Sequence, residues 1–473
     1  MFKKFSLLRP ILAILVFFIP LYPKFPLFNV TNTYVAVRLD DIVIAISLLF
    51  LLVNQVIKGF PVFKQKITWI FIAYFTAITL STIYAVLVSQ TDPTNILLLH
   101  LFRRFEYISL FFLTVSAIDY PTDFRFFYIF LFITTIGVSI YGYGQKYLHF
   151  PIISTMNSEF SKGQLLQMDI WSRVSSTFAG HYDLAAYLSV VLIIIGVVTI
   201  LQKNIFVKIV SLTFWLGFYN LLNLTASRVS VFAYLGGMVI ALILVRKYFW
   251  VIPVIILFGF SILNSPELNQ RLLATIPALK TQISRLFPTP IPVVIPTTAP
   301  IVAVIPTTGV YQPNYPTPTT APIIIRHPPT EEVIPIDADI GVARSGEIRF
   351  NVEWPRAINA YSKNPLTGTG LGSLTLATDN DYLRSLGESG LLGLITFLMI
   401  PIYFLIKTFP IIFKKKLNST DHLLLIFLGC LFTVFANATL IDVFEASKTA
   451  YLFWIMMGFY YVTLQAKELE IKK

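Results

Sequence analysis

The stretch Thr378–Phe397, TDNDYLRSLGESGLLGLITF, joins a charged segment directly to an apolar one. Its first eleven residues include Asp379, Asp381, Arg384 and Glu388, and the rest begins a long apolar run. That run is close to the ~20 residues that a helix needs to cross ~30 Å of hydrocarbon. The stretch therefore predicts a membrane-spanning helix with both kinds of charge at its outer end.

The rest of the chain has the same apolar character. Of 473 residues, 56% are hydrophobic and 13% charged, and the mean hydropathy is +0.74, which is far from an ordinary soluble domain. We therefore expect an all-α, polytopic membrane protein with about twelve transmembrane helices and one large external loop. The expected spans are residues 7–22, 42–57, 67–88, 96–117, 126–145, 184–202, 209–224, 229–246, 248–263, 390–407, 422–441 and 449–465.

The expected membrane topology explains the net charge of +12. If the N-terminus is cytoplasmic, short basic clusters such as Lys3 with Lys4, Lys64 with Lys66, and Lys414–Lys416 all fall on one side. The positive-inside rule therefore accounts for the basicity, and no nucleic-acid partner is expected. The same rule predicts that both termini are cytoplasmic and that the large loop is outside.

This topology divides the chain into three parts. Residues 1–263 hold nine helices, 264–389 form the large extracytoplasmic loop, and 390–473 hold the last three helices. Within the loop, about 288–335 is rich in Pro and Thr and contains the near-repeats IPTTAP, IPTTG and TPTTAP. Such a composition favours extended polyproline II over helix, so we interpret it as an inserted external tether.

Several arginines lie at the predicted membrane surface. Arg173 and Arg228 flank external helix ends, Arg349 and Arg344 return from the loop to the same side, and the pair Arg103–Arg104 lies within a span. A charge at membrane depth costs about 2.5 kcal/mol or more, so each requires an explanation. Arginine forks suit phosphate, which predicts a lipid-linked pyrophosphate as ligand. Snorkelling or pairing with a carboxylate is the alternative for each one alone.

Five segments carry a family resemblance. The late block RFNVEWPRAINAYSKNPLTGTGLGSL and DNDYLRSLGESGLLGL is the most specific, and SRVSSTFAGHYDLAAYL, TASRVSVFAYLGG and VRLDDIVIAISLL precede it. Together they resemble the O-antigen ligase and O-antigen polymerase family. The resemblance implies a bundle of about twelve helices that moves a glycan from undecaprenyl pyrophosphate to a glycan or glycolipid acceptor, without a metal or other cofactor. It also implies that Arg173 and Arg228 bind the donor pyrophosphate and that Arg349 is the family's loop arginine.

The chain departs from this family at one position. Ligases commonly carry His-Asn where this chain has Asp379-Asn380. Asp379 or Asp381 is therefore our candidate for the base that takes the acceptor's proton. The alternative is that one of them caps the following helix, while Arg384 and Glu388 form an i,i+4 pair on it.

His181 and Asp183 are a secondary acid/base candidate, although Asp183 also suits the cap of the sixth span. No metal site is predicted, because the other histidines have no ligand spacing. The run TGTGLG at 367–372 has no βαβ context, so we interpret it as a flexible turn near the acceptor and not a nucleotide loop.

A secondary solute transporter is the main alternative function, because about twelve spans also suit that class. Transporters usually show two matching halves with ionisable groups near the midplane. This chain gathers its arginines at one face and has a single lopsided loop, which favours glycosyl transfer. A structural scaffold would leave the arginines unexplained.

The topology predicts the labelling of introduced cysteines. A cysteine at Thr308 should react with an impermeant maleimide in intact cells, and one at Lys415 should react only after permeabilisation, because the basic loop is cytoplasmic. Labelling in the reverse order would invert the topology.

Overall fold

The computed structural model describes residues 7–29, 36–89, 94–153, 165–166, 173–264, 348–374 and 377–472. The Pro/Thr-rich segment at 288–335 and Arg344 lie outside the described residues. Strands occur only as two small antiparallel hairpins in this part of the chain. These are β1 (Pro26–Asn29) with β2 (Ala36–Arg38), and β3 (Ile152–Ile153) with β4 (Leu165–Leu166).

A helix coincides with each of the twelve predicted apolar segments, which confirms their helical character. Within the described residues, seven helices have the length and composition to cross a membrane. The total number of crossings stays a prediction. The helices are α1 (Leu8–Leu21), α2 (Leu39–Ile57), α3 (Lys66–Tyr84), α4 (Thr94–Ala117), α5 (Phe124–Leu148), α6 (His181–Leu201), α7 (Ile205–Leu224), α8 (Arg228–Leu244), α9 (Val251–Asn264), α12 (Trp354–Lys363), α13 (Asp381–Ile412), α14 (Ser419–Asn437) and α15 (Ser447–Lys472).

Helix α6 lies at the centre of one half of the bundle. It is apolar on all faces and is almost completely buried from Leu184 to Val197. Because no face is polar, it is suited to an interior position, and it packs against α7, α8 and α14. Small residues let α8 and α14 approach closely, since a Cβ on Gly237 would lie 2.8 Å from the carbonyl oxygen of Gly429.

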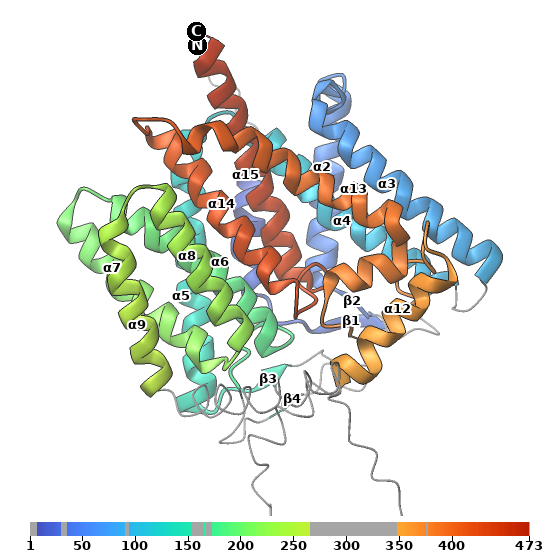
Figure 1. Cartoon of the computed structure of the whole chain (residues 1–473), viewed down its shortest axis with the longest axis horizontal. Helices are drawn as coiled ribbons and strands as arrows, with labels where there is room; N and C mark the ends of the chain where they lie inside the picture. Colours follow the sequence, from blue (N-terminus) through green and yellow to red (C-terminus); the bar gives the residue numbers. More distant parts are fainter. Residues whose placement is uncertain are drawn as a thin grey trace, which may run out of the picture.

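The two ends of the bundle differ in charge. At the end where α15 terminates, the carboxylate of Asp421 binds Lys414 at 2.8 Å and Lys467 at 2.9 Å. Arg246 donates to the carbonyls of Lys414 and Lys415 at the same end. The opposite end holds β1, β2 and α12 (Figure 1). Basic loops and the candidate site residues therefore occupy opposite ends.

Lys448 ties the first and last helices together. Its ammonium is 1% exposed and donates to the carbonyl oxygens of Pro20 at 3.0 Å, Tyr22 at 2.7 Å and Thr177 at 2.7 Å. Three acceptors satisfy all three of its protons. The end of α1, the segment before α6 and the start of α15 are thereby joined at one point.

Helix α13 is interrupted at Gly390, where the backbone turns to φ 65° and ψ −167°. The TGTGLG turn fills the break with backbone hydrogen bonds, so it is fixed against α13 and our expectation of a flexible turn is wrong. The bonds run from Thr369 N to Gly387 O (3.0 Å), Gly370 N to Glu388 O (2.9 Å), Leu391 N to Pro365 O (2.9 Å) and Leu392 N to Leu366 O (3.1 Å).

We predict that Gly390→Ala lowers the thermal stability of the detergent-purified protein. A Cβ there would lie 2.4 Å from the Leu366 carbonyl oxygen, and the left-handed backbone adds about 1–3 kcal/mol of strain. Gly259→Ala is the matched control, since nothing lies within 4 Å of its added Cβ. Equal transition midpoints for the two variants in a size-exclusion melt would contradict the close approach.

Candidate functional site

A polar cavity of about 260 Å³ lies at the end of the bundle that holds α12. Four helices begin at its wall, because α2 follows Arg38, α6 follows Gly180, α13 begins two residues after Asp379 and α15 begins with Ser447. Helix N-termini carry partial positive charge and favour anions. Its charged lining consists of Lys24, Arg38, Arg103, Asp183, Asp379, Asp442 and Glu445.

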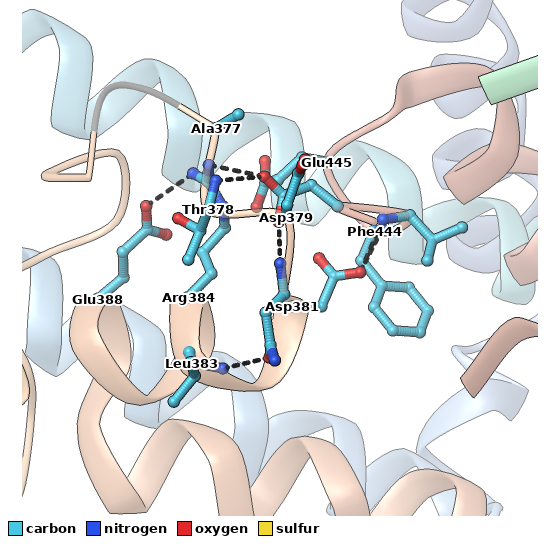
Figure 2. Close-up of polar contacts among 12 residues, drawn as sticks. Ala377, Thr378, Asp379, Asp381, Leu383, Arg384, Glu388, Phe444 and Glu445 are labelled. Carbon is cyan, nitrogen blue, oxygen red and sulfur yellow. Dashed lines mark hydrogen bonds and ion pairs between the residues drawn. The ribbon is translucent and has the colours of Figure 1, made fainter. Parts of the chain in front are cut away.

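Two carboxylates lock the start of α13 to the α14–α15 connection. Asp442 accepts hydrogen bonds from the backbone amides of residues 378 (2.8 Å) and 380 (3.2 Å). In return, Asp381 accepts from the amides of residues 443 (2.7 Å) and 444 (3.2 Å), as Figure 2 shows for Phe444. We call this exchange the reciprocal clamp. The Asp381 carboxylate is thereby bound to backbone amides, and Asp381 is only 7% exposed.

The cap of α13 is Asn380, and our expectation that Asp379 or Asp381 caps the helix is wrong. The Asn380 side chain accepts from the Leu383 amide at 2.9 Å. A cap needs an extended backbone, which Asn380 has at φ −166°. Asp379 is left-handed at φ 49°, and Asp381 is already the first helical residue.

Arg384 and Glu388 form the predicted i,i+4 pair, with Nη1 and Oε1 3.1 Å apart. Arg384 also binds Asp442 at 3.0 Å through Nη2, and both Arg384 and Glu388 are buried. Removing one partner of a buried ion pair leaves a charge that costs several kcal/mol. The set therefore holds the reciprocal clamp in place.

Arg104 has a similar structural role. It pairs with Glu445 and donates to the Phe444 carbonyl at 3.0 Å. Burial alone would raise the pKa of Glu445, but the charges of Arg104 and Arg384 lower it to about 2. Its neighbour Arg103 lines the polar cavity instead.

The structure brings Arg173, Arg228 and Arg349 together around Tyr182. The Arg173 guanidinium carbon lies 5.9 Å from the centre of the Tyr182 ring. The charges of Arg173 and Arg349 act on Tyr182, and Arg228 interacts electrostatically with Tyr182 and both other arginines. We call these three residues the arginine triad. They come from three separate segments of the chain.

Asp379 connects the arginine triad to the polar cavity. Its Oδ2 lies 2.7 Å from Nη2 and 2.9 Å from Nε of Arg349, and its side chain is 25% exposed. Burial raises the pKa of Asp379, and the charge of Arg349 opposes this rise. The left-handed backbone of Asp379 is strained for a residue other than glycine, as is common at functional sites. Of the two candidate bases, Asp379 therefore has the accessible carboxylate.

His181 and Asp183 have different neighbours. His181 Nε2 lies 2.6 Å from Nη1 of Arg173, at the arginine triad. The positive charges of Lys24 and Lys448 act on Asp183. The expected cap of α6 by Asp183 is wrong, because Gly180 is the N-cap and no side chain caps that helix.

Five residues of this site were not predicted from the sequence: Lys24, Arg38, Tyr182, Asp442 and Glu445. Asp442 and Glu445 lie in the short connection IDVFEAS between the last two helices. Two acidic residues in a short connection on the predicted external side were the available signal. No group of three or more His, Cys, Asp or Glu in the described ranges is arranged to hold a metal.

The chain matches no protein-family model, and no curated protein matches it. The resemblance to the O-antigen ligase and polymerase family therefore stays a prediction from the motifs.

We predict that Asp442→Asn lowers the unfolding free energy by about 2 kcal/mol or more, because one carboxylate serves Arg384 and two amides. Asp379→Asn is the matched control. Its ion pair is more exposed, and Asn tolerates the left-handed backbone. Thermal transitions of both variants in detergent give the comparison, and a larger loss for Asp379→Asn would contradict the reciprocal clamp.

Proposed function

We propose that this protein is a metal-independent membrane glycosyltransferase of the O-antigen ligase or polymerase type. It moves a glycan from undecaprenyl pyrophosphate to a glycan or glycolipid acceptor at the external face of a bacterial plasma membrane, for surface polysaccharide assembly. The observation that carries this proposal is the arginine triad beside Asp379. The three arginines and Asp379 lie at one end of an apolar helical bundle.

The donor pyrophosphate lies among the arginine triad. Guanidinium groups hold phosphate oxygens by paired hydrogen bonds and stay charged at any physiological pH. As the bond between the donor's anomeric carbon and its phosphate oxygen breaks, negative charge develops on the leaving pyrophosphate. Fixed positive groups stabilise that developing charge most, because they need no reorganisation during the reaction.

Asp379 is the base in this proposal. An acceptor hydroxyl gives its proton to the Asp379 carboxylate while its oxygen bonds to the donor's anomeric carbon. Burial raises the pKa of Asp379 from its ordinary value, which makes it a better proton acceptor. Its ion pair with Arg349 sets its position beside the leaving group.

The charge distribution supports an external site. Lys414, Lys467 and Arg246 gather at the end opposite α12. The positive-inside rule assigns such an end to the cytoplasm. The arginine triad and the polar cavity then face outward, where lipid-linked glycans are assembled into surface polymers.

One observation favours the transporter alternative: α13 is interrupted at Gly390. Broken helices form substrate sites in many transporters. In this chain, however, backbone of the TGTGLG turn fills the interruption. The transfer assay below separates the two functions, because a transporter does not form a glycosidic bond.

We predict that Arg228→Lys and Arg173→Lys each lower glycan transfer in proteoliposomes by about 100-fold or more, because an ammonium cannot replace the paired fork. Asp379→Asn should bind donor normally and be inactive, because an amide does not accept the proton. Donor binding is measured alongside by filtration of radiolabelled undecaprenyl-pyrophosphate glycan.

The matched control is Arg9→Lys, which keeps the partly exposed pair with Asp123 at the other end of α1 and should retain activity. Full transfer by both triad variants would refute the pyrophosphate site. Substrate uptake without any transfer would favour the transporter.

A further inference from the structure

An apolar cavity of about 190 Å³ lies between α6, α7, α8 and α9. Its lining includes Ile200 at the end of α6, Leu212 in the first half of α7 and Trp250 just before α9. Helix α6 begins at the polar cavity and α8 begins with Arg228 of the arginine triad, so this cavity lies toward the opposite, basic end of the bundle. We call it the α9 cavity.

The α9 cavity is suited to an apolar guest. Glycine, proline, methionine, tryptophan and aliphatic residues make up its lining. The indole Nε1 of Trp215 donates to the Leu192 carbonyl oxygen at 2.9 Å and therefore needs no partner in the cavity. A cavity of this kind stays dry and accepts apolar molecules. Because Leu216 in the lining is 43% exposed, the cavity opens on the apolar outer surface of the bundle.

Helix α9 is packed loosely, and the α9 cavity is the space beneath it. Of its fourteen residues, Val254 and Ser261 are buried, whereas Ile252, Ile256 and Phe260 are each more than half exposed. A molecule in the cavity would contact α7 and α9 at once, because both helices line it. Each such contact adds a small dispersion attraction, and together they would hold α9 to the bundle.

A lysine lies on the face of α7 that lines the α9 cavity. Lys208 precedes Leu212 by four residues and Leu216 by eight, and residues four apart are neighbours on a helix surface. Leu212 and Leu216 both line the cavity. Lys208 is therefore one turn closer to the basic end on the same face.

Two more lysines flank the other walls at this end. Lys203 follows Ile200 by three residues, and Lys247 precedes Trp250 by three. Both lysines are exposed, and Ile200 and Trp250 line the α9 cavity. We call Lys203, Lys208 and Lys247 the lysine rim. Three walls of one apolar cavity thus each continue into a cation at the basic end.

The lysine rim is not neutralised by nearby carboxylates. Among the described residues, no carboxylate lies within 4 Å of the three ammonium groups. Lys247 and Asp421 both act electrostatically on His422, but Asp421 is already bound to Lys414 at 2.8 Å and Lys467 at 2.9 Å. The rim therefore keeps a net positive charge beside an apolar opening.

We infer that the α9 cavity and the lysine rim bind one anionic phospholipid, with its phosphate at the rim and one acyl chain between α7 and α9. Basic clusters beside transmembrane helices attract anionic headgroups. The lining near α9 runs from Trp250 to Leu257, about 10 Å along a helix axis, which fits within the ~15 Å of hydrocarbon in one leaflet. Headgroup and chain are thus placed at the depths that a bilayer lipid occupies.

This inference goes beyond the proposed function and does not depend on it. A lipid that binds the folded chain stabilises it, and here it would fill the space beneath α9. Helix α9 ends at Asn264, where the predicted large loop begins. The bound lipid would therefore fix the helix from which that loop leaves the bundle.

Native mass spectrometry of the full chain in detergent tests the site, with phosphatidylglycerol as the probe and phosphatidylcholine for comparison. We expect one phosphatidylglycerol on each chain, bound about tenfold or more tightly than phosphatidylcholine. Lys208→Gln should weaken it about fivefold through the lost charge. Leu216→Trp keeps every cation and should weaken it about tenfold or more, because the indole fills the opening. Phosphatidylglycerol should raise the thermal transition of the wild type and not that of Leu216→Trp.

Each variant has a matched control that should bind phosphatidylglycerol normally. Lys64→Gln removes an exposed lysine on the same predicted side, between α2 and α3. Val210→Trp places an indole at a residue of α7 that is 39% exposed and does not line the α9 cavity. Glycerol phosphate, which has the headgroup charge without acyl chains, should not displace the lipid at equal concentration.

Several results would overturn the inference. Equal affinity for the two lipids, or unchanged affinity in Lys208→Gln, would remove the role of the lysine rim. Normal binding by Leu216→Trp would remove the role of the α9 cavity. An equal loss in Lys64→Gln would assign the attraction to overall charge, and displacement by glycerol phosphate would exclude a bound acyl chain. None of these results bears on glycan transfer, so the proposed function stands or falls separately.

Discussion

The reciprocal clamp is the interaction on which the candidate site depends. Two carboxylates, Asp381 and Asp442, each accept two backbone amides from the other's segment. Segments more than sixty residues apart in the sequence are thereby held in one register, at a helix end where four amides would otherwise need partners. The clamp fixes the backbone around Asp379, which alone among these acids is left to face Arg349. A precise site requires side-chain positions that are set by surrounding residues.

The charges in the opening stretch of sequence therefore divide into two classes. Asp381, Arg384 and Glu388 are buried. Arg384 forms an ion pair with Glu388, and Asp381 accepts hydrogen bonds from backbone amides. Asp379 is the partly exposed member, and it lies next to the arginine triad. A chain can hold both signs of charge at a membrane surface when most of them pair, because paired and hydrogen-bonded ions recover much of the cost of leaving water.

The sequence predicted the helices well, because an apolar run of sufficient length has few alternatives in a membrane. It placed Arg173, Arg228 and Arg349 on one predicted side, since the first two fall at helix ends and the third follows the large loop. It misassigned the caps, because the choice among Asp379, Asn380 and Asp381 depends on backbone torsions and not on residue type. It also missed Asp442 and Lys24, whose roles arise from contacts between segments far apart in the chain. The break at Gly390 escaped notice for the same reason, since its hydrogen bonds go to the TGTGLG turn.

The three-carbonyl site of Lys448 has a consequence for biosynthesis. Its acceptors, Pro20, Tyr22 and Thr177, are made early, whereas Lys448 enters the membrane with the last helix. Until then the hydrogen bond from the Thr177 hydroxyl to the Pro20 carbonyl oxygen (2.6 Å) joins the end of α1 to the segment before α6, but the loop bearing Asp442 has no anchored helix after it. A nascent chain released before this point would carry a helical bundle without a closed site. Assembly of the site is thereby made the last step of synthesis.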